Sequence, residues 1–245
     1  GLNGAALFNY SVVQLNSPVA CPLTFTVQGV VYHNSTDSNG QNEESLPAGT
    51  PFATDFAQSC NNAFTQFYKQ LEGGKLAHTA SAYFGLDQSW DIGLGPNSYF
   101  HIPTDSSGAE LAQETFGQGK ITASPLAMAS VAATVGTGSF HQPYLVDGLT
   151  KVSATALPSG TDANLKTVMH MVVTSGTAAS VFHGVGTVYA KTGTADADAN
   201  KDGKPNSWMV VYDPSKDVAI GTVVVDAGFG ASYAGPEAQH VLSAL

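Results

Sequence analysis

The sequence predicts an α+β fold in which a helical half is joined to an antiparallel sheet half. Before residue 175 the apolar residues recur mainly at spacings of three and four, as on the buried face of a helix. After it come three runs of β-branched and aromatic residues, joined by turn-rich segments short enough for antiparallel hairpins. Since no repeat or linker divides the chain, we expect a single domain over residues 1–245, with a helical part at roughly 34–160 and a sheet part from 1–33 and 161–245.

The first part of the chain is rich in Asn, Ser, Gly and Pro and contains one β-like run, Leu23–Tyr32, before the polar stretch 34–44. This pattern predicts a strand followed by a solvated loop. From residue 54 the spacing becomes helical, and the small polar groups of residues 59–61 interrupt it. The predicted buried positions of this stretch are Phe56, Cys60, Phe64, Phe67 and Leu71.

Two later helices have clear ends in the sequence. Ser124 as N-cap and Pro125 at the first helical position begin a helix that should run to Gly136. Another should begin near Asp162 and end at Ser175. Its predicted buried face carries Leu165, Val168, Met169 and Val172.

The last seventy residues change to the period of strands. The predicted strands are Val185–Lys191, Trp208–Tyr212 and Val218–Val225. The tail from Pro236 to Leu245 is predicted to close the fold as an amphipathic helix with Ala238, Val241 and Leu242 inward.

Composition and charge exclude several classes of protein. Charged residues are 11% of the chain and hydrophobic ones 43%, which is typical of a compact globular protein. The formal charge of −10 would repel a phosphate backbone, so we expect no nucleic-acid partner. All nine basic residues are lysine, so a bound carboxylate has to be held by lysine, hydroxyls and backbone amides. No apolar run approaches the roughly 18 to 20 residues that span a bilayer, although an anchor could precede the chain.

The residues typical of metal sites and disulfide frameworks are sparse. The two cysteines, Cys21 and Cys60, are expected to be separate thiols, with a single bridge as the alternative in a secreted protein. The seven histidines share no metal-like spacing. The acidic stretch 196–202 alternates oxygen ligands as a calcium loop does, but it has Lys201 at the sixth position and Ser207 at the twelfth. We therefore predict a solvated hairpin loop there and no metal.

One motif stands out at the end of the first predicted strand of the sheet half, Lys191-Thr192-Gly193-Thr194. An amine and two hydroxyls on an edge strand can hold an anionic peptide end, and the glycine allows close approach of a ligand. Ser59-Cys60-Asn61 heads a helix in the first half, and Phe116-Gly117-Gln118-Gly119 precedes the helix that begins at Ser124.

With these motifs in this order the chain resembles the transpeptidase domain of penicillin-binding proteins, most closely the class B, elongation-type enzymes of actinobacteria. Ser59-Cys60-Asn61 looks like the second motif of the family and Lys191-Thr192-Gly193 like the third. The resemblance covers about residues 16–245. It implies the penicillin-binding and serine β-lactamase fold, with an antiparallel sheet flanked by helices and an all-helical subdomain.

The family's first motif, Ser-x-x-Lys, is absent from the sequence, since no lysine has a serine three positions before it. The nearest imitation, Ser11–Gln14, ends in an amide that cannot accept the serine proton. Relatives continue from a Leu-Asn-Gly stretch into the motif and then into an Ala-rich helix. Our hypothesis is that roughly a dozen residues bearing the nucleophile are missing between Gly4 and Ala5, about the length of a helix that opens with the motif.

The resemblance implies a D,D-transpeptidase that cross-links peptidoglycan stem peptides ending in D-Ala-D-Ala through an acyl-serine, and that β-lactams acylate. Ser59 would relay the proton, Asn61 would orient the substrate amide, and Lys191 would supply positive potential. Thr192 and Thr194, with Gly193 between them, would bind the substrate carboxylate, and the Thr194 N–H would complete the oxyanion hole. No cofactor is implied. The expected partners include cell-wall synthesis membrane proteins, and the expected location is the extracytoplasmic face of the membrane.

Three alternatives remain open. The site could hydrolyse instead of transfer, as a D,D-carboxypeptidase or a β-lactamase, although no residue is identified as the base for a deacylating water. A non-catalytic sensor or scaffold of the same fold would explain the absent nucleophile. Last, the motif matches could be accidental in an unrelated α+β binding domain.

Overall fold

The structure is a computed structural model that describes residues 1–35, 44–196 and 203–245. The acidic stretch predicted as a hairpin loop falls largely outside the described residues. Among the described residues the helices are α1 (Leu2–Asn9), α2 (Phe52–Ala57), α3 (Asn61–Thr65), the 3₁₀ helix η1 (Tyr68–Leu71), α4 (Lys75–Phe84), α5 (Gly108–Glu114), α6 (Pro125–Thr137), α7 (Ser159–Thr174) and α8 (Ala234–Ala244). The strands are β1 (Thr24–Val27), β2 (Val30–His33), β3 (Ser89–Asp91), β4 (Pro96–Ser98), β5 (Phe100–His101), β6 (Thr122–Ala123), β7 (Tyr189–Ala195), β8 (Asn206–Asp213) and β9 (Val218–Val224).

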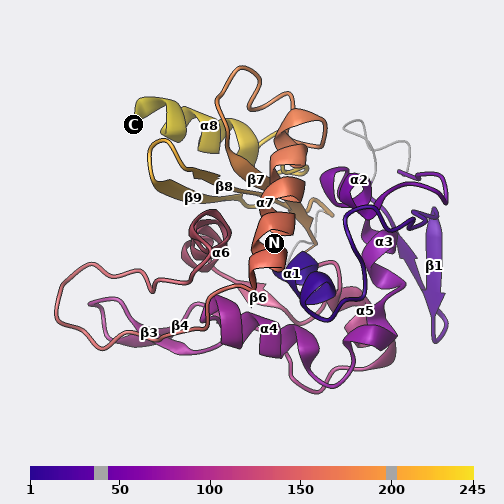
Figure 1. Ribbon diagram of the computed structural model, residues 1–245, viewed down its shortest axis with the longest axis horizontal. Helices are drawn as coiled ribbons and strands as arrows, with labels where there is room; N and C mark the ends of the chain where they lie inside the picture. Colours follow the sequence, from indigo (N-terminus) through magenta and orange to yellow (C-terminus); the bar gives the residue numbers. More distant parts are fainter. Residues whose placement is uncertain (36–43, 197–202) are drawn as a thin grey trace.

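The main sheet is antiparallel and has the order β7-β8-β9, as the sequence predicts for its last third. Helices α6 and α8 both pack against β8 and β9, and in Figure 1 they lie on opposite sides of the sheet. Gly221 in β9 allows the close approach of α6, because a Cβ at this position would lie 2.3 Å from the Pro125 carbonyl oxygen. On the far side of the sheet from β9, the edge of β7 faces the helical half (Figure 1).

The helical half is attached through α7, which packs against α2 and β7. Helix α1 packs against α4 and α7 and so occupies the centre of the molecule (Figure 1). Short two-stranded sheets, β1-β2, β3-β4 and β5-β6, lie outside the main sheet. Among the described helices, none is long and apolar enough to cross a membrane.

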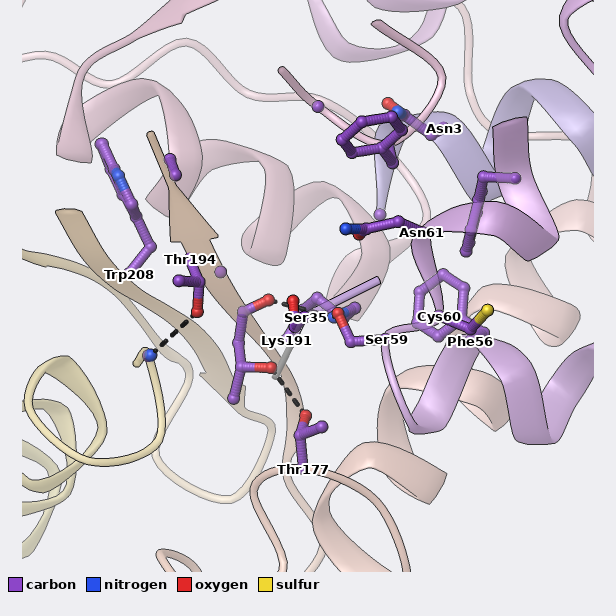
Figure 2. Close-up of a pocket in the computed structure, with 18 of the residues that line it drawn as sticks. Asn3, Ser35, Phe56, Ser59, Cys60, Asn61, Thr177, Lys191, Thr194 and Trp208 are labelled. Carbon is purple, nitrogen blue, oxygen red and sulfur yellow. Dashed lines mark hydrogen bonds between the residues drawn. The ribbon is translucent and has the colours of Figure 1, made fainter. Parts of the chain in front are cut away.

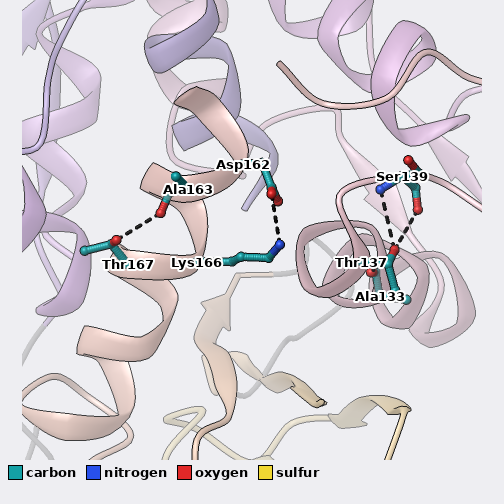
Figure 3. Close-up of polar contacts among 7 residues, drawn as sticks. All are labelled: Ala133, Thr137, Ser139, Asp162, Ala163, Lys166 and Thr167. Atoms are coloured by element: carbon teal, nitrogen blue, oxygen red, sulfur yellow. Dashed lines mark hydrogen bonds and ion pairs between the residues drawn. The ribbon is translucent and has the colours of Figure 1, made fainter. Parts of the chain in front are cut away.

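The predicted ends of α6 are confirmed to within one residue. The Ser124 hydroxyl accepts the Ala127 N–H at 3.1 Å, and Pro125 is the first helical residue. At the other end, the hydroxyl of Thr137, the last helical residue, lies 2.9 Å from the carbonyl oxygens of Ala133 and Ser139 and can donate its proton to either (Figure 3).

Helix α7 begins three residues before the predicted start and ends at Thr174, next to the predicted stop. Its first turns carry an ion pair between Lys166 and Asp162 at 2.9 Å, an i,i+4 spacing, and the Thr167 hydroxyl donates to the Ala163 carbonyl (Figure 3). The four predicted core residues of this helix are all fully buried.

Several predictions are wrong in ways that have local causes. The single strand predicted over 23–32 is a hairpin of β1 and β2, because Gln28 and Gly29 both adopt positive φ and form a tight turn. It pairs outside the main sheet, so residues 1–33, assigned to the sheet part, contribute this hairpin and α1 instead. Strand β7 begins at Tyr189, later than predicted, because the Val185 N–H is used in a turn to the Phe182 carbonyl. Val241 of α8, which was predicted to face inward, is 49% exposed.

The expectation of two free thiols is also wrong, because Cys21 and Cys60 form a disulfide with their Cα atoms 6.1 Å apart. Both cysteines are fully buried. Their spacing in sequence gives no sign of this pairing. An isolated antiparallel β-bridge between Cys21 and Leu46, followed along the chain by α2, brings the segment of Cys21 close to that of Cys60.

Candidate active site

A cavity of about 850 Å³ lies between the edge of β7, the segment before α3 and the N-terminal end of α1. Its lining includes all the residues selected from the sequence: Ser59, Asn61, Lys191, Thr192, Gly193 and Thr194. Among the described lining residues, Lys191 supplies the cation and Glu44 the carboxylate. The two halves of the fold therefore place both predicted motifs on one cavity (Figure 2).

Lys191 and Ser59 are in direct contact across 132 positions of sequence. The Lys191 Nζ donates to the Ser59 Oγ at 2.6 Å and to the Thr192 carbonyl at 3.0 Å, and it lies 5.9 Å from the centre of the Phe56 ring. Burial lowers the pKa of Lys191 to about 8, against the opposing effect of the Glu44 carboxylate. At neutral pH the Lys191 side chain is still mostly an ammonium. Its hydrogen bond to the Ser59 oxygen therefore makes the Ser59 hydroxyl a better proton donor.

The backbone of Ser59 has to depart from a helix to make this contact. Helix α2 ends at Ala57, and Ser59 adopts φ +63°, a left-handed conformation that costs a non-glycine residue roughly 1 kcal/mol or more. The Cys60 N–H then donates to the Asp55 carbonyl at 3.0 Å. This turn explains why the predicted helical stripe is broken at these small polar residues.

Asn61 is the first residue of α3 and lies beside Ser59 on the cavity wall (Figure 2). Its Nδ2 donates to the His33 carbonyl at 3.1 Å, which fixes the side chain against β2. The amide oxygen is thereby directed away from that carbonyl. The structure brings Asn61 and Lys191 to the same cavity and gives no direct bond between them among the described contacts.

The three residues after Lys191 present different groups. The buried Thr192 hydroxyl pairs with the Thr177 hydroxyl at 2.6 Å, and the Thr194 hydroxyl accepts the Gly230 N–H at 3.3 Å. Gly193 leaves room for Trp208, whose Cβ would lie 3.0 Å from a Cβ at this position. The Thr194 hydroxyl proton therefore remains able to reach a carboxylate in the cavity, whereas one proton of the Thr192 and Thr177 pair lies between the two hydroxyls.

The N-terminal end of α1 opens onto the same cavity, where Gly1, Leu2, Asn3 and Gly4 line the wall. The structure does not support a gap between Gly4 and Ala5. Helix α1 runs unbroken through this junction, the Ala5 N–H donates to the Gly1 carbonyl at 2.9 Å, and a Cβ at Gly4 would lie 2.8 Å from the Phe56 ring.

Three lining residues were not assigned a role from the sequence. Thr177 orients Thr192, Glu44 acts electrostatically on Lys191, and Gln118 donates from its Nε2 to the Thr194 carbonyl at 3.2 Å. Gln118 stands in the segment 116–119, which the sequence singles out beside the motifs. Nothing in the sequence around Glu44 distinguishes it from a solvated loop.

Within the described ranges, one group of side chains has the spacing of a metal site, Cys21, Asp55 and Cys60. Both sulfur atoms are in the disulfide and cannot coordinate an ion in this state.

Comparisons with known proteins identify the family of the chain. The model of the penicillin binding protein transpeptidase domain matches residues 23–245. Peptidoglycan D,D-transpeptidase PbpA of Mycolicibacterium smegmatis is 28% identical over 193 residues, which are 71% of this chain and 38% of that protein. The chain spans less than half the length of the curated relatives it matches.

Solved structures show the same fold. The D,D-transpeptidase domain of a peptidoglycan glycosyltransferase from Eggerthella lenta is 24% identical with a TM-score of 0.78, covering 99% of this chain and 62% of that one. The penicillin G acyl-enzyme complex of penicillin-binding protein A from Mycobacterium tuberculosis is 23% identical with a TM-score of 0.80, covering 99% and 59%. The predicted α+β fold of this type is thus confirmed.

Proposed function

The chain belongs to the penicillin-binding protein transpeptidase domain family, and from this premise we propose that it forms the D,D-transpeptidase domain of a peptidoglycan cross-linking enzyme. The single observation that carries the proposal is the 2.6 Å contact between Lys191 and Ser59 in a cavity shared with Asn61 and Thr194. Such a set supplies a polarised hydroxyl, an amide and a donor for an anion, which acyl transfer needs around one carbonyl.

In this proposal a serine nucleophile attacks the penultimate D-alanine carbonyl of a stem peptide. The tetrahedral oxyanion accepts hydrogen bonds from the Thr194 N–H and from the N–H of the nucleophile. The lysine of the Ser-x-x-Lys motif would take the proton of the attacking hydroxyl. As the intermediate collapses and its C–N bond breaks, Ser59 relays this proton to the leaving amine of the terminal D-alanine, and Lys191 keeps Ser59 polarised. The amine of a second stem peptide then attacks the acyl-serine and forms the cross-link.

The substrate is held by the groups at the edge of β7. Thr194 donates its hydroxyl proton to the terminal carboxylate, Thr192 is oriented by Thr177 for the same task, and the Lys191 charge attracts the anion. Gly193 lets the peptide lie against the strand, and Asn61 orients the substrate amide. β-Lactams present the same carboxylate and acyl group, and the penicillin G complex of the mycobacterial relative supports this extension.

The nucleophile belongs at the N-terminal end of α1, because that end lines the same cavity as Lys191 and Ser59. A Ser-x-x-Lys turn leading into Gly1 would place its serine in the cavity and continue the helix. We thus place the missing motif ahead of Gly1, instead of between Gly4 and Ala5 as predicted from the sequence. The coding sequence ahead of Gly1 tests it: a Ser-x-x-Lys within about one helical turn supports the placement, and its absence there contradicts it.

The direct experiment is labelling of the full-length protein with fluorescent penicillin, with competition by a peptide ending in D-Ala-D-Ala. We expect one covalent label per chain and protection by the peptide. A rapid loss of the label would instead indicate hydrolysis, as in a β-lactamase. The proposed partners, membrane proteins of cell-wall synthesis, and an extracytoplasmic location follow from the same activity.

A second candidate is a non-catalytic sensor or scaffold of this fold, and the absence of Ser-x-x-Lys from the sequence favours it. It predicts that the full-length protein is not labelled by penicillin but still binds the peptide or the drug reversibly. Quenching of Trp208 fluorescence on addition of ligand would detect such binding, since Trp208 lines the cavity.

A further inference from the structure

The disulfide lies inside the candidate site. Cys60 is the residue between Ser59 and Asn61, so the bridge to Cys21 is attached to the middle of the segment that provides both side chains. In Figure 2 the Cys60 sulfur lies on the side of Phe56 away from the Ser59 hydroxyl. Cys60 lines the cavity, but both cysteines are fully buried, so the bridge supports the segment from within the fold.

Cys60 fixes the residues on both sides of it. Its Sγ accepts the Ala63 N–H at 3.3 Å, so it is the N-cap of α3, the helix that Asn61 begins. On the other side Ser59 is held at φ +63°. A non-glycine residue keeps such a conformation only where its surroundings impose it. The disulfide at the next residue, together with the bonds from the Ser59 N–H to the Phe56 carbonyl and from the Cys60 N–H to the Asp55 carbonyl, supplies such surroundings.

Asp55 gives the bridge an unusual neighbour. Its side chain is fully buried, and within the described ranges neither carboxylate oxygen has a hydrogen-bond partner. A carboxylate oxygen and the two sulfur atoms lie within 4.8 Å of one another. A disulfide has no proton to donate, whereas two thiols have two. Reduction would thus supply the donors that this buried carboxyl group lacks.

From these contacts we propose that Cys21, Cys60 and Asp55 form a redox site that positions Ser59 and Asn61 for the reaction. The bridged form holds the two side chains toward Lys191, and the dithiol form releases them. The reductant is a dithiol: it gives two electrons and two protons, each cysteine gains one hydrogen, and the donor becomes a cyclic disulfide. This proposal rests on the proposed function only where penicillin acylation is used to measure its effect.

The first experiment measures how readily the bridge is reduced. The full-length protein is equilibrated in dithiol redox buffers, free thiols are alkylated, and the intact mass is read. We expect Asp55→Ala to make the bridge about tenfold harder to reduce, which is about 30 mV for two electrons. Glu114→Ala is the matched control, because Glu114 is another buried carboxyl with an unpartnered oxygen. Equal potentials for Asp55→Ala and the wild type would overturn the role of Asp55.

The second experiment measures positioning. The rate constant of penicillin acylation is compared for the bridged protein, the reduced protein and Cys21→Ala, each shown to be folded by circular dichroism. We expect a loss of at least about tenfold in acylation with reversible affinity little changed, and recovery when the bridge re-forms. A lower melting temperature with unchanged acylation would show a merely structural disulfide and overturn the proposal.

A third readout separates this proposal from the proposed function. If the bridged protein is not acylated at all, the transpeptidase assignment fails, but the amide resonances of Ser59 and Asn61 still report their positions. We expect both to shift on reduction in nitrogen-15 spectra of the full-length protein. Unchanged resonances would overturn the positioning role whatever the activity.

Discussion

Replacing Lys191 by methionine should make the protein more stable although it removes a central group of the site. Burial shifts the pKa of Lys191 from 10.5 to about 8. At about 1.4 kcal/mol per pKa unit, this shift means that the buried ammonium costs roughly 3 kcal/mol at neutral pH. Methionine has a similar length and can lie against Phe56. Loss of the bond to Ser59 offsets about 1 kcal/mol, so we expect a net gain of about 2 kcal/mol.

The pH dependence of this gain identifies its cause. Between pH 8 and 10.5 the unfolded wild-type chain holds a proton on Lys191 that the folded chain has lost. The stability of the wild type therefore rises with pH in this window relative to Lys191→Met, and the gap of about 2 kcal/mol closes at about pH 10, above which the wild type becomes the more stable protein. Urea unfolding of both proteins at pH 7 and pH 10 measures it. Lys216→Met is the matched control, since Lys216 is exposed and its replacement should have little effect.

The reasoning would be refuted if Lys191→Met were less stable than the wild type at pH 7. It would also be refuted if the gap between the two proteins were the same at both pH values. Either result would mean that the ammonium is solvated or better paired than its surroundings indicate.

Three further predictions concern single residues. Burial, with a contribution from the Glu44 charge, raises the pKa of Asp55 from 3.8 to about 7. The free energy of unfolding of the wild type, relative to Asp55→Asn, should therefore fall by up to about 4 kcal/mol from pH 4 to 7. Urea unfolding that gives the same difference between the two proteins at every pH would contradict this. Thr177→Val removes the partner of the Thr192 hydroxyl and should slow penicillin acylation of the full-length protein about tenfold; an unchanged rate constant would rule out this orienting role. Gly221→Ala places a Cβ 2.3 Å from the backbone of α6 and should lower stability by about 2 kcal/mol or more, whereas Gly160→Ala, with open space around it, should not; equal melting temperatures would count against the close packing.

Much of the sheet half could be predicted from the sequence because its signals are local. Ser124 and Pro125 fix the start of α6, and the β-branched runs give β8 and β9 within two residues. The candidate site could be located because Lys191 and Ser59 belong to short motifs with distinctive residue types. Their 2.6 Å contact depends on the packing of α7 between the two halves, which no local pattern contains.

The helical half was harder to predict because tertiary contacts decide it. The polar residues 59–61 mark an interruption of the helical stripe, but the left-handed conformation of Ser59 is one that no serine prefers, so its geometry could not be predicted. The Cys21–Cys60 bridge depends on two segments meeting in space. Helix α1 was missed because it is short and six of its eight residues are buried, so it has no alternation of apolar and polar faces to predict it.

Release of D-alanine tests the central claim most directly. The full-length protein with its disulfide intact is given a donor peptide ending in D-Ala-D-Ala and an acceptor amine, and D-alanine and cross-linked product are both counted. The account predicts one D-alanine per cross-link, and loss of both products in Lys191→Met. A folded, bridged protein that releases no D-alanine and forms no cross-link would contradict it.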